Sequence, residues 1–361
     1  GFKQIEWRAC EGAPDGAEPW ICVVNGQPVF LQGVNWVPPR ICYHDSTEAE
    51  YARLVTLYRD MGCNLFRVWG GAILEKEIFY DLCDRNGILV WQEFPLSSSG
   101  VENYPPEGPK AIASLTAIAA SYIRKRGHHV SLLMWGGGNE LTERTPDATP
   151  VDNTHPCIAA LKDVVVRDDP GRRFVPTSSS GPQFYAHAAN FGKGIHHDVH
   201  GPWGFGPVGE GGFADLEAWK TYWEADDALF RSEVGMPGAS PKTIFEQFSG
   251  ELPAFPPQGE YWMHGSAWWT QWDRYQARLG HLDGVQGLAE YIRLTQEQQA
   301  EAYAIAAKAC KRRFPRCGGF IVWMGHDCYP CPANNAVIDF LRQPKLAYFA
   351  LQRVFLAKES L

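Results

Sequence analysis

Short apolar runs alternate along the chain with longer segments in which apolar residues recur every three or four positions. The short runs leave no room for a helix and often end at glycine, so they predict buried strands, whereas the longer segments predict amphipathic helices. One predicted helix follows Ser46 or Thr47 and ends at Met61, with Glu50 placed for a capping box around Thr47. The other predicted helices are 75–85, 109–125, 155–167, 286–313 and 344–355. The predicted strands are 28–36, 63–69, 88–92, 130–135, 173–177, 195–200, 229–233 and 318–323.

The order strand, glycine stop, helix repeats along the chain, which is typical of a parallel α/β sheet. Eight such strands among 361 residues predict a single-domain α/β fold, a (β/α)8 TIM barrel over residues 21–361. A doubly wound open sheet is the alternative, but no glycine fingerprint for a dinucleotide follows the first strand. Residues 1–20 are rich in Gly and Pro and predict a lead-in, and the aromatic segment 250–284 predicts an insertion that walls a site.

The composition narrows the class of protein. The chain is 45% hydrophobic and 20% charged, which fits a globular protein with a substantial core. A net charge of −8 without a basic stripe argues against a nucleic-acid partner. No apolar run reaches about 18 residues, so we expect neither a transmembrane helix nor a membrane partner. The chain begins at Gly1, so we expect that its N-terminus was trimmed together with any localisation signal, and a periplasmic or extracellular location stays open.

Cysteine and histidine patterns give only weak indications of a metal. Most of the ten cysteines lie in apolar segments, where a buried thiol is the simplest expectation. Cys328 and Cys331 form a close pair, but one pair without a second is a weak sign of zinc or redox chemistry. His196, Asp198 and His200 would share one face of a strand and could form a ligand set, which we keep as a minor alternative.

Two predicted strands each deliver a glutamate at their carboxyl end. Strand 130–135 is followed by three glycines and then by Asn139 and Glu140, and strand 229–233 ends in Glu233. In a TIM barrel these ends meet at one mouth. Hydrolysis of a glycosidic bond needs two acids there, one to protonate the departing oxygen and one to attack or to activate water. A strand-end glutamate is also often a surface or salt-bridge residue, so spacing alone leaves both roles open.

A set of motifs occurs in one order over nearly the whole chain. They are Asn25-Gly26, Gly33-Val34-Asn35-Trp36-Val37-Pro38, Arg67-Val68-Trp69-Gly70-Gly71, Cys83-Asp84, Gly87-Ile88-Leu89-Val90-Trp91-Gln92, Asn139-Glu140, Ser232-Glu233-Val234-Gly235 and Ile321-Val322-Trp323. In this order the set resembles the catalytic domain of glycoside hydrolase family 2, nearest to its β-mannosidase branch. The resemblance implies an oligosaccharide or glycoside as substrate.

The resemblance also implies a retaining mechanism without a metal or a cofactor. Glu140 would be the general acid/base, and Glu233 would be the nucleophile that forms a glycosyl-enzyme intermediate. The two carboxyl groups should then lie about 5–5.5 Å apart, against about 6.5–9.5 Å in an inverting enzyme. Glu140 must hold its proton near neutral pH, so we expect its surroundings, including the charge of Glu233, to raise its pKa.

Seven further residues would bind the sugar or shape the site according to the resemblance. Asn139 would bind the hydroxyl beside the reacting carbon, and Trp323 would form the floor under the sugar ring. His200 would lie near the nucleophile, with Trp203 lining the pocket. The others are Arg67 and Trp69, which would shape the site around the nucleophile, and Asp327, which would reach the sugar together with His326 unless both have a plain loop role.

Departures from the family pattern leave the sugar specificity undetermined. The β-mannosidase branch usually carries a second Asn where this chain has Gly138, and the stretch 324–327 also differs. The Asn-x-Lys signature of the β-glucuronidases is not seen, since 334–336 reads Asn-Asn-Ala. β-Galactosidase, β-glucuronidase and exo-β-glucosaminidase specificity remain alternatives, and so does a non-catalytic carbohydrate-binding barrel.

The first residues carry one more expectation. Residues 1–6 resemble the last strand of the sandwich domain that precedes the barrel in this family. We therefore expect N-terminal β-domains of the same protein as partners of the barrel, because such domains can contribute a residue to the sugar pocket.

Overall fold

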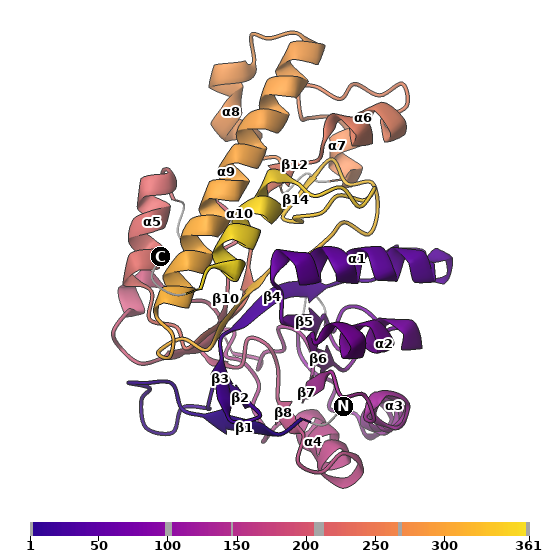
Figure 1. Ribbon diagram of the computed structural model, residues 1–361, viewed down its shortest axis with the longest axis vertical. Coiled ribbons are helices and arrows are strands. Elements are labelled where there is room, and N and C mark those ends of the chain that lie inside the picture. Colours follow the sequence, from indigo (N-terminus) through magenta and orange to yellow (C-terminus); the bar gives the residue numbers. More distant parts are fainter. Residues whose placement is uncertain (1–2, 98–102, 146, 206–212, 266–268, 359–361) are drawn as a thin grey trace.

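The computed structural model describes residues 3–97, 103–145, 147–205, 213–265 and 269–358. A curled nine-stranded sheet lies at the centre, in the order β8-β7-β6-β5-β4-β13-β11-β10-β9 (Figure 1). Its recorded pairings are parallel except that between β9 and β10. The strands are β4 (Leu31–Trp36), β5 (Leu65–Val68), β6 (Leu89–Glu93), β7 (Leu132–Gly136), β8 (Arg173–Val175), β9 (Gly181–Pro182), β10 (His196–His200), β11 (Phe230–Val234) and β13 (Gly319–Val322).

Seven of the predicted strands are confirmed to within two residues at each end. The prediction 28–36 is wrong as a single strand, because the chain divides at Phe30. Before this point β3 (Gln27–Val29) pairs with β2 (Ile21–Val24), and β2 pairs in turn with β1 (Ile5–Arg8). After it, β4 joins the large sheet between β5 and β13. The expected lead-in thus contains β1, a strand of a separate antiparallel sheet.

The helices pack along the curled sheet. α1 to α4 follow one flank, and α5, α9 and α10 follow the other (Figure 1). The predicted capping box is confirmed, since the Thr47 hydroxyl accepts from the Glu50 amide at 3.3 Å and the Glu50 carboxylate accepts from the Thr47 amide at 3.0 Å. The helices are α1 (Glu48–Met61), α2 (Glu77–Asn86), α3 (Pro109–Arg126), α4 (Pro156–Asp168), α5 (Leu216–Ala225), α6 (Lys242–Phe248), α7 (Glu260–Gly265), α8 (Trp272–Leu279), α9 (Gly284–Arg312) and α10 (Leu346–Leu356).

The aromatic segment 250–284 forms a cluster on α9. Trp262 of α7 and both Trp272 and Tyr275 of α8 pack their rings on Tyr291 of α9, with centroids 5.7–6.2 Å apart. Beside this cluster, β12 (Gly238–Ala239) pairs with β14 (Ala333–Asn334). None of the helices in the described ranges is long and apolar enough to cross a membrane.

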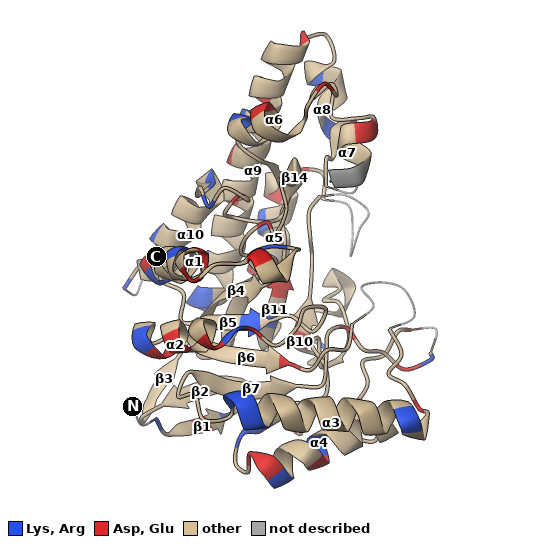
Figure 2. Ribbon diagram, turned by 90° about the vertical axis from the view of Figure 1, so that its right-hand side faces the viewer, with Lys and Arg blue, Asp and Glu red and all other residues tan. Residues whose placement is uncertain are grey.

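The strands bury apolar side chains, but charged side chains are buried with them. Figure 2 shows charged positions on the helices and also among the central strands. A buried charge is costly unless it is paired. The wholly or almost wholly buried charged residues of the strands are Arg67, Glu93, Asp198, Arg231 and Glu233. Three of these five, Arg67, Glu93 and Glu233, belong to the site described next.

Candidate active site

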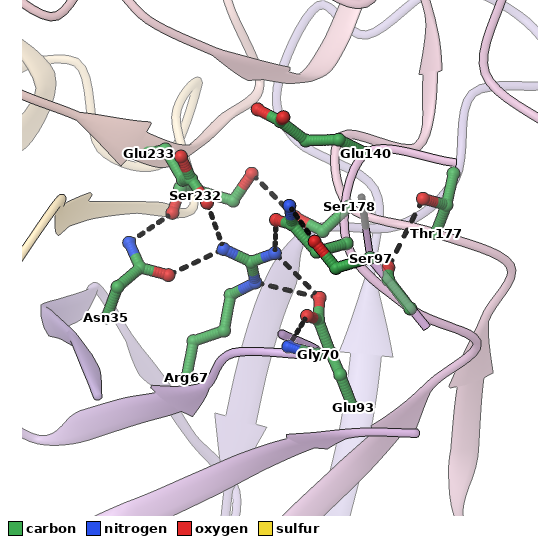
Figure 3. Close-up of polar contacts among 12 residues, drawn as sticks. Asn35, Arg67, Gly70, Glu93, Ser97, Glu140, Thr177, Ser178, Ser232 and Glu233 are labelled. Atoms are coloured by element: carbon green, nitrogen blue, oxygen red, sulfur yellow. Dashed lines mark hydrogen bonds and ion pairs between the residues drawn. The ribbon is translucent and has the colours of Figure 1, made fainter. Parts of the chain in front are cut away.

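Arg67 of β5 holds together the ends of several strands (Figure 3). Its guanidinium donates to Glu93 Oε1 at 2.9 Å and to Glu233 Oε1 at 2.6 Å. It also donates to Asn35 Oδ1 at 2.6 Å and to Asn139 Oδ1 at 2.7 Å. Because the fork geometry of a guanidinium fixes several acceptors at once, these contacts orient both acids and both amides.

The charges around Arg67 compensate one another. The side chains of Arg67 and Glu93 are fully buried, and that of Glu233 is 4% exposed. Glu93 Oε2 also accepts from the Gly70 amide at 2.7 Å. A lone cation here would be strongly destabilising, and the two carboxylates supply the partners that the burial of Arg67 requires.

Glu140 stands four residues beyond β7 in a left-handed backbone conformation, with φ of 54°. Few residues other than glycine adopt this conformation, and such outliers gather at functional sites. The Glu140 amide donates to the Ser178 carbonyl at 2.6 Å, which links the chain beyond β7 to the chain beyond β8. Oε1 of Glu140 lies 2.9 Å from Nδ1 of His200.

The pKa values at the site are shifted mainly by burial. Burial raises the pKa of Glu140 to about 7, while Arg67 opposes the rise. The predicted direction is confirmed, but burial rather than the charge of Glu233 is the main cause. Burial also raises the pKa of Glu233, while His200 and Arg67 oppose the rise. Burial lowers the pKa of His200 to about 4, so its imidazole is neutral near neutral pH.

The two glutamates converge. One carboxylate oxygen of Glu140 and one of Glu233 lie within 4.8 Å of each other, and Nδ1 of His200 lies 3.6 Å from Glu233 Oε2. This separation fits the retaining class, in which the carboxyl groups are about 5–5.5 Å apart, rather than the inverting class at about 6.5–9.5 Å.

Indole rings lie beside these acids. Trp69 and Trp323 pack edge to face with centroids 5.3 Å apart, and Trp203 packs in the same manner against His200 at 6.2 Å. Trp203 also lies against Gly235, where a Cβ would stand only 2.7 Å from its ring. The structure therefore places the three predicted tryptophans just beyond the ends of β5, β10 and β13.

Asp327 and His326 have recorded partners of a different kind. Asp327 is 1% exposed and accepts from Asn334 Nδ2 at 3.1 Å. The His326 side chain is fully buried, with Nδ1 2.9 Å from the Tyr58 hydroxyl. Among the described residues neither has a recorded contact with Glu140 or Glu233, in contrast to Arg67 and His200.

The glycine at position 138 is explained by steric crowding. A Cβ at this position would stand 2.5 Å from the Leu96 carbonyl oxygen and 2.7 Å from Leu96 Cβ. The backbone beyond β6 therefore occupies the space in which the family's usual second asparagine would place its side chain.

The predicted ligand set of His196, Asp198 and His200 does not come together around one point. His196 Nδ1 contacts Asp227 at 2.6 Å, while Asp198 accepts from the Ser180 amide at 2.9 Å, so the predicted set does not converge. Two clusters with ligand atoms within 4.8 Å lie elsewhere: Glu77, His128 and His129, and Asp81, Asp84 and His129. The same proximity of Glu140, His200 and Glu233 is explained by the contacts described above.

Several polar residues of the site were not predicted. Asn35 and Glu93 contact Arg67, and Ser178 and Ser232 contact each other at 3.0 Å. Glu93 could have been predicted from Arg67, because a cation inside an apolar strand needs a buried acid from a neighbouring strand. Ser178 had no such signal.

Replacing Arg67 tests whether it holds the site together. We expect Arg67→Ala to lower the free energy of unfolding by about 3–5 kcal/mol, because it leaves Glu93 and Glu233 buried without their cation. Chemical denaturation measures this loss. Arg293→Ala is the matched control, because Arg293 is 46% exposed and its contacts with Glu290 and Glu297 are screened by water. Equal stability of the two variants would contradict the role assigned to Arg67.

Comparisons with known proteins give consistent results. A scan against protein-family models gives no match. The chain is 27% identical to β-mannosidase B of Emericella nidulans over 92% of its own length, and 26% identical to that of Aspergillus fumigatus over 92%. It spans only about 40% of the length of these curated relatives.

Solved structures share the fold. A β-D-mannosidase from Dictyoglomus thermophilum superposes with a TM-score of 0.80 at 24% identity, covering 98% of this chain and 42% of the other. A β-galacturonidase of glycoside hydrolase family 2 from Eisenbergiella tayi superposes with a TM-score of 0.60 at 17% identity, covering 98% and 54%. The resemblance expected from the motifs is thus confirmed: the chain is similar in sequence to proteins named β-mannosidase B, and in fold to a solved β-D-mannosidase and to a solved β-galacturonidase of glycoside hydrolase family 2.

Proposed function

We propose that the chain is the catalytic part of a retaining exo-β-glycosidase that hydrolyses a terminal β-linked sugar. One observation carries the proposal: the carboxyl groups of Glu140 and Glu233 converge, with a raised pKa of about 7 on the first and the Arg67 guanidinium on the second. We also infer that the curled sheet is a (β/α)8 barrel. The eight predicted strands all belong to one sheet: β5 to β8 follow one another outward on one side of β4, and β13, β11 and β10 follow one another outward on the other side.

Each acid has one role in this mechanism. Glu233 attacks the anomeric carbon while Glu140 gives its proton to the departing oxygen, so that the carbon–oxygen bond breaks as the glycosyl-enzyme bond forms. Glu140, now ionised, takes a proton from water, which attacks the anomeric carbon and releases Glu233. Arg67 holds Glu233 in place at 2.6 Å and aligns Asn139 for the sugar hydroxyl beside the reacting carbon.

The expected sugar is mannose. The relatives named β-mannosidase B and the solved β-D-mannosidase support this choice. Trp69, Trp203 and Trp323 would offer ring faces and edges to the apolar side of the sugar. Gly138 differs from the β-mannosidase pattern, so galactose, glucuronic acid and glucosamine remain as alternatives.

A panel of 4-nitrophenyl β-glycosides tests the proposal on the purified full-length protein. We expect hydrolysis of the β-mannoside at a higher kcat/KM than that of the galactoside, glucuronide or glucosaminide. The configuration of the first product, followed by NMR, should be that of the substrate. Tight sugar binding without hydrolysis of any member would favour the non-catalytic alternative instead.

The pH dependence follows from the pKa of Glu140. Its acid form is required, and its pKa is about 7, so we expect kcat/KM to fall as the pH rises through this value. Initial rates on the accepted glycoside between pH 4 and 9 measure the basic limb, with circular dichroism as the control for folding. A constant kcat/KM across neutral pH would contradict the assignment of Glu140 as the acid.

A further inference from the structure

A continuous chain of polar side chains ends at Glu140. The Ser232 hydroxyl donates to Asp198 Oδ1, and the Ser178 and Ser232 hydroxyl oxygens lie 3.0 Å apart. Ser178 Oγ lies 3.0 Å from Nε2 of His200, whose Nδ1 lies 2.9 Å from Oε1 of Glu140. Asp198, Ser232, Ser178 and His200 are fully buried, so bulk water does not reach the hydrogen bonds between them.

The first hydrogen bonds have a fixed direction because Asp198 only accepts. As a carboxylate it has no proton to give. Its Oδ2 already accepts from the Ser180 amide at 2.9 Å and from the Ser180 hydroxyl at 3.2 Å. Ser232 therefore uses its one proton on Asp198 and can only accept from Ser178. Ser178 uses its proton on Ser232 and can only accept from His200.

The direction continues through the imidazole. His200 must carry its proton on Nε2 to donate to Ser178, and a neutral imidazole then has a bare Nδ1. A bare nitrogen 2.9 Å from Oε1 makes a hydrogen bond only if Glu140 is protonated. The opposite tautomer would leave the Ser178 and Ser232 oxygens 3.0 Å apart with no proton between them.

We propose that Asp198, Ser232, Ser178 and His200 form a directional hydrogen-bond relay that holds Glu140 in its acid form. The relay rests on the proposed function, in which Glu140 is the general acid. Its members are positioning residues: they act through His200 on Glu140. The anionic form of Glu140 would face a nitrogen lone pair, so the relay disfavours it beyond the effect of burial.

Other charges face Glu140 from the neighbouring strands. Arg67 of β5 favours its anionic form, and Glu140 in turn raises the pKa of Glu233 of β11. Glu93 of β6 is ion-paired with Arg67. None of these groups belongs to the relay, so a change at Asp198 leaves each of them in place.

Asp198→Asn reverses the relay without changing its shape. The amide oxygen can accept from Ser180 in place of Oδ2, and the amide NH2 then donates to Ser232. Ser232 donates to Ser178, Ser178 donates to Nε2, and His200 presents Nδ1–H to Glu140. A donor stabilises the carboxylate, so we expect the basic limb of kcat/KM to move to lower pH by about one unit.

Two further variants complete the test. Ser178→Ala interrupts the relay and no longer fixes the tautomer of His200, so the basic limb of kcat/KM should also move to lower pH. Ser180→Ala removes one hydrogen-bond donor from Asp198 but does not change the direction of the relay, so the basic limb of kcat/KM should not move. A titration of the labelled Glu140 carboxyl by 13C NMR gives the same comparison without turnover.

The outcomes are separable. If the wild-type protein hydrolyses no glycoside, the proposed function fails. If it is active and Asp198→Asn is folded and active with an unmoved limb and an unmoved Glu140 titration, the relay is overturned and the proposed function stands.

Discussion

Glu233→Ala is expected to lower the turnover of every accepted glycoside by about 10⁴-fold or more, because no glycosyl-enzyme bond can form without the nucleophile. Glu233 is the acid that Arg67 holds at 2.6 Å, so its removal takes away the attacking oxygen while Arg67 keeps Glu93 as a partner. Initial rates of phenol release from the accepted aryl β-glycoside measure the loss.

Adding azide to the Glu233→Ala variant tests the same assignment through the configuration of the product. In Glu233→Ala an azide ion can enter from the face that the carboxylate has vacated, and the expected product is the glycosyl azide of inverted configuration. Glu246→Ala is the matched control, since Glu246 lies on α6 with a side chain 53% exposed. Wild-type rates in Glu233→Ala, or a rescued product of retained configuration, would contradict the assignment.

The sheet could be predicted from the sequence because its signal is local. Parallel strands are buried on both faces and read as apolar runs, as at 88–92 and 130–135, which are followed by Glu93 and Gly136. The division of 28–36 could not be read in the same way. Pro28 and Leu31 both fit an extended segment, and only the pairing of β3 with β2 shows that the two belong to different sheets.

Glu233 could also be predicted because it lies within β11, and Glu140 could be predicted from the Gly-Gly-Gly-Asn-Glu run at the end of β7. Asp327 lies five residues beyond β13, and its recorded side-chain contact is with Asn334 of β14. A residue several positions beyond a strand depends on the turn that follows, and the turn is not determined by the strand. Ser178 meets Ser232 and His200 only because the curled sheet brings β8, β10 and β11 together, which no local pattern contains.

Glu140→Ala is expected to discriminate between leaving groups. On glycosides with a poor leaving group, kcat/KM should fall by about 10²–10⁴-fold, because the departing oxygen then leaves without a proton. A 2,4-dinitrophenyl glycoside leaves as a stable anion and should lose far less. Because kcat/KM reports the steps up to the first irreversible one, this comparison isolates formation of the glycosyl-enzyme.

The same variant has two further signatures that follow from the position of Glu140. The basic limb near pH 7 should disappear, since the group with the pKa of about 7 is gone. Azide should restore turnover of the dinitrophenyl glycoside and give the glycosyl azide of retained configuration, because it enters from the face on which Glu140 lay while Glu233 still forms the intermediate. Glu140→Gln keeps the shape of the side chain but has no acidic proton, so it should show the same loss. Equal losses of kcat/KM on both leaving groups in either variant would show that Glu140 is not the acid. A glycosyl azide of retained configuration would show that Glu140 lies on the face of the sugar opposite to that of Glu233.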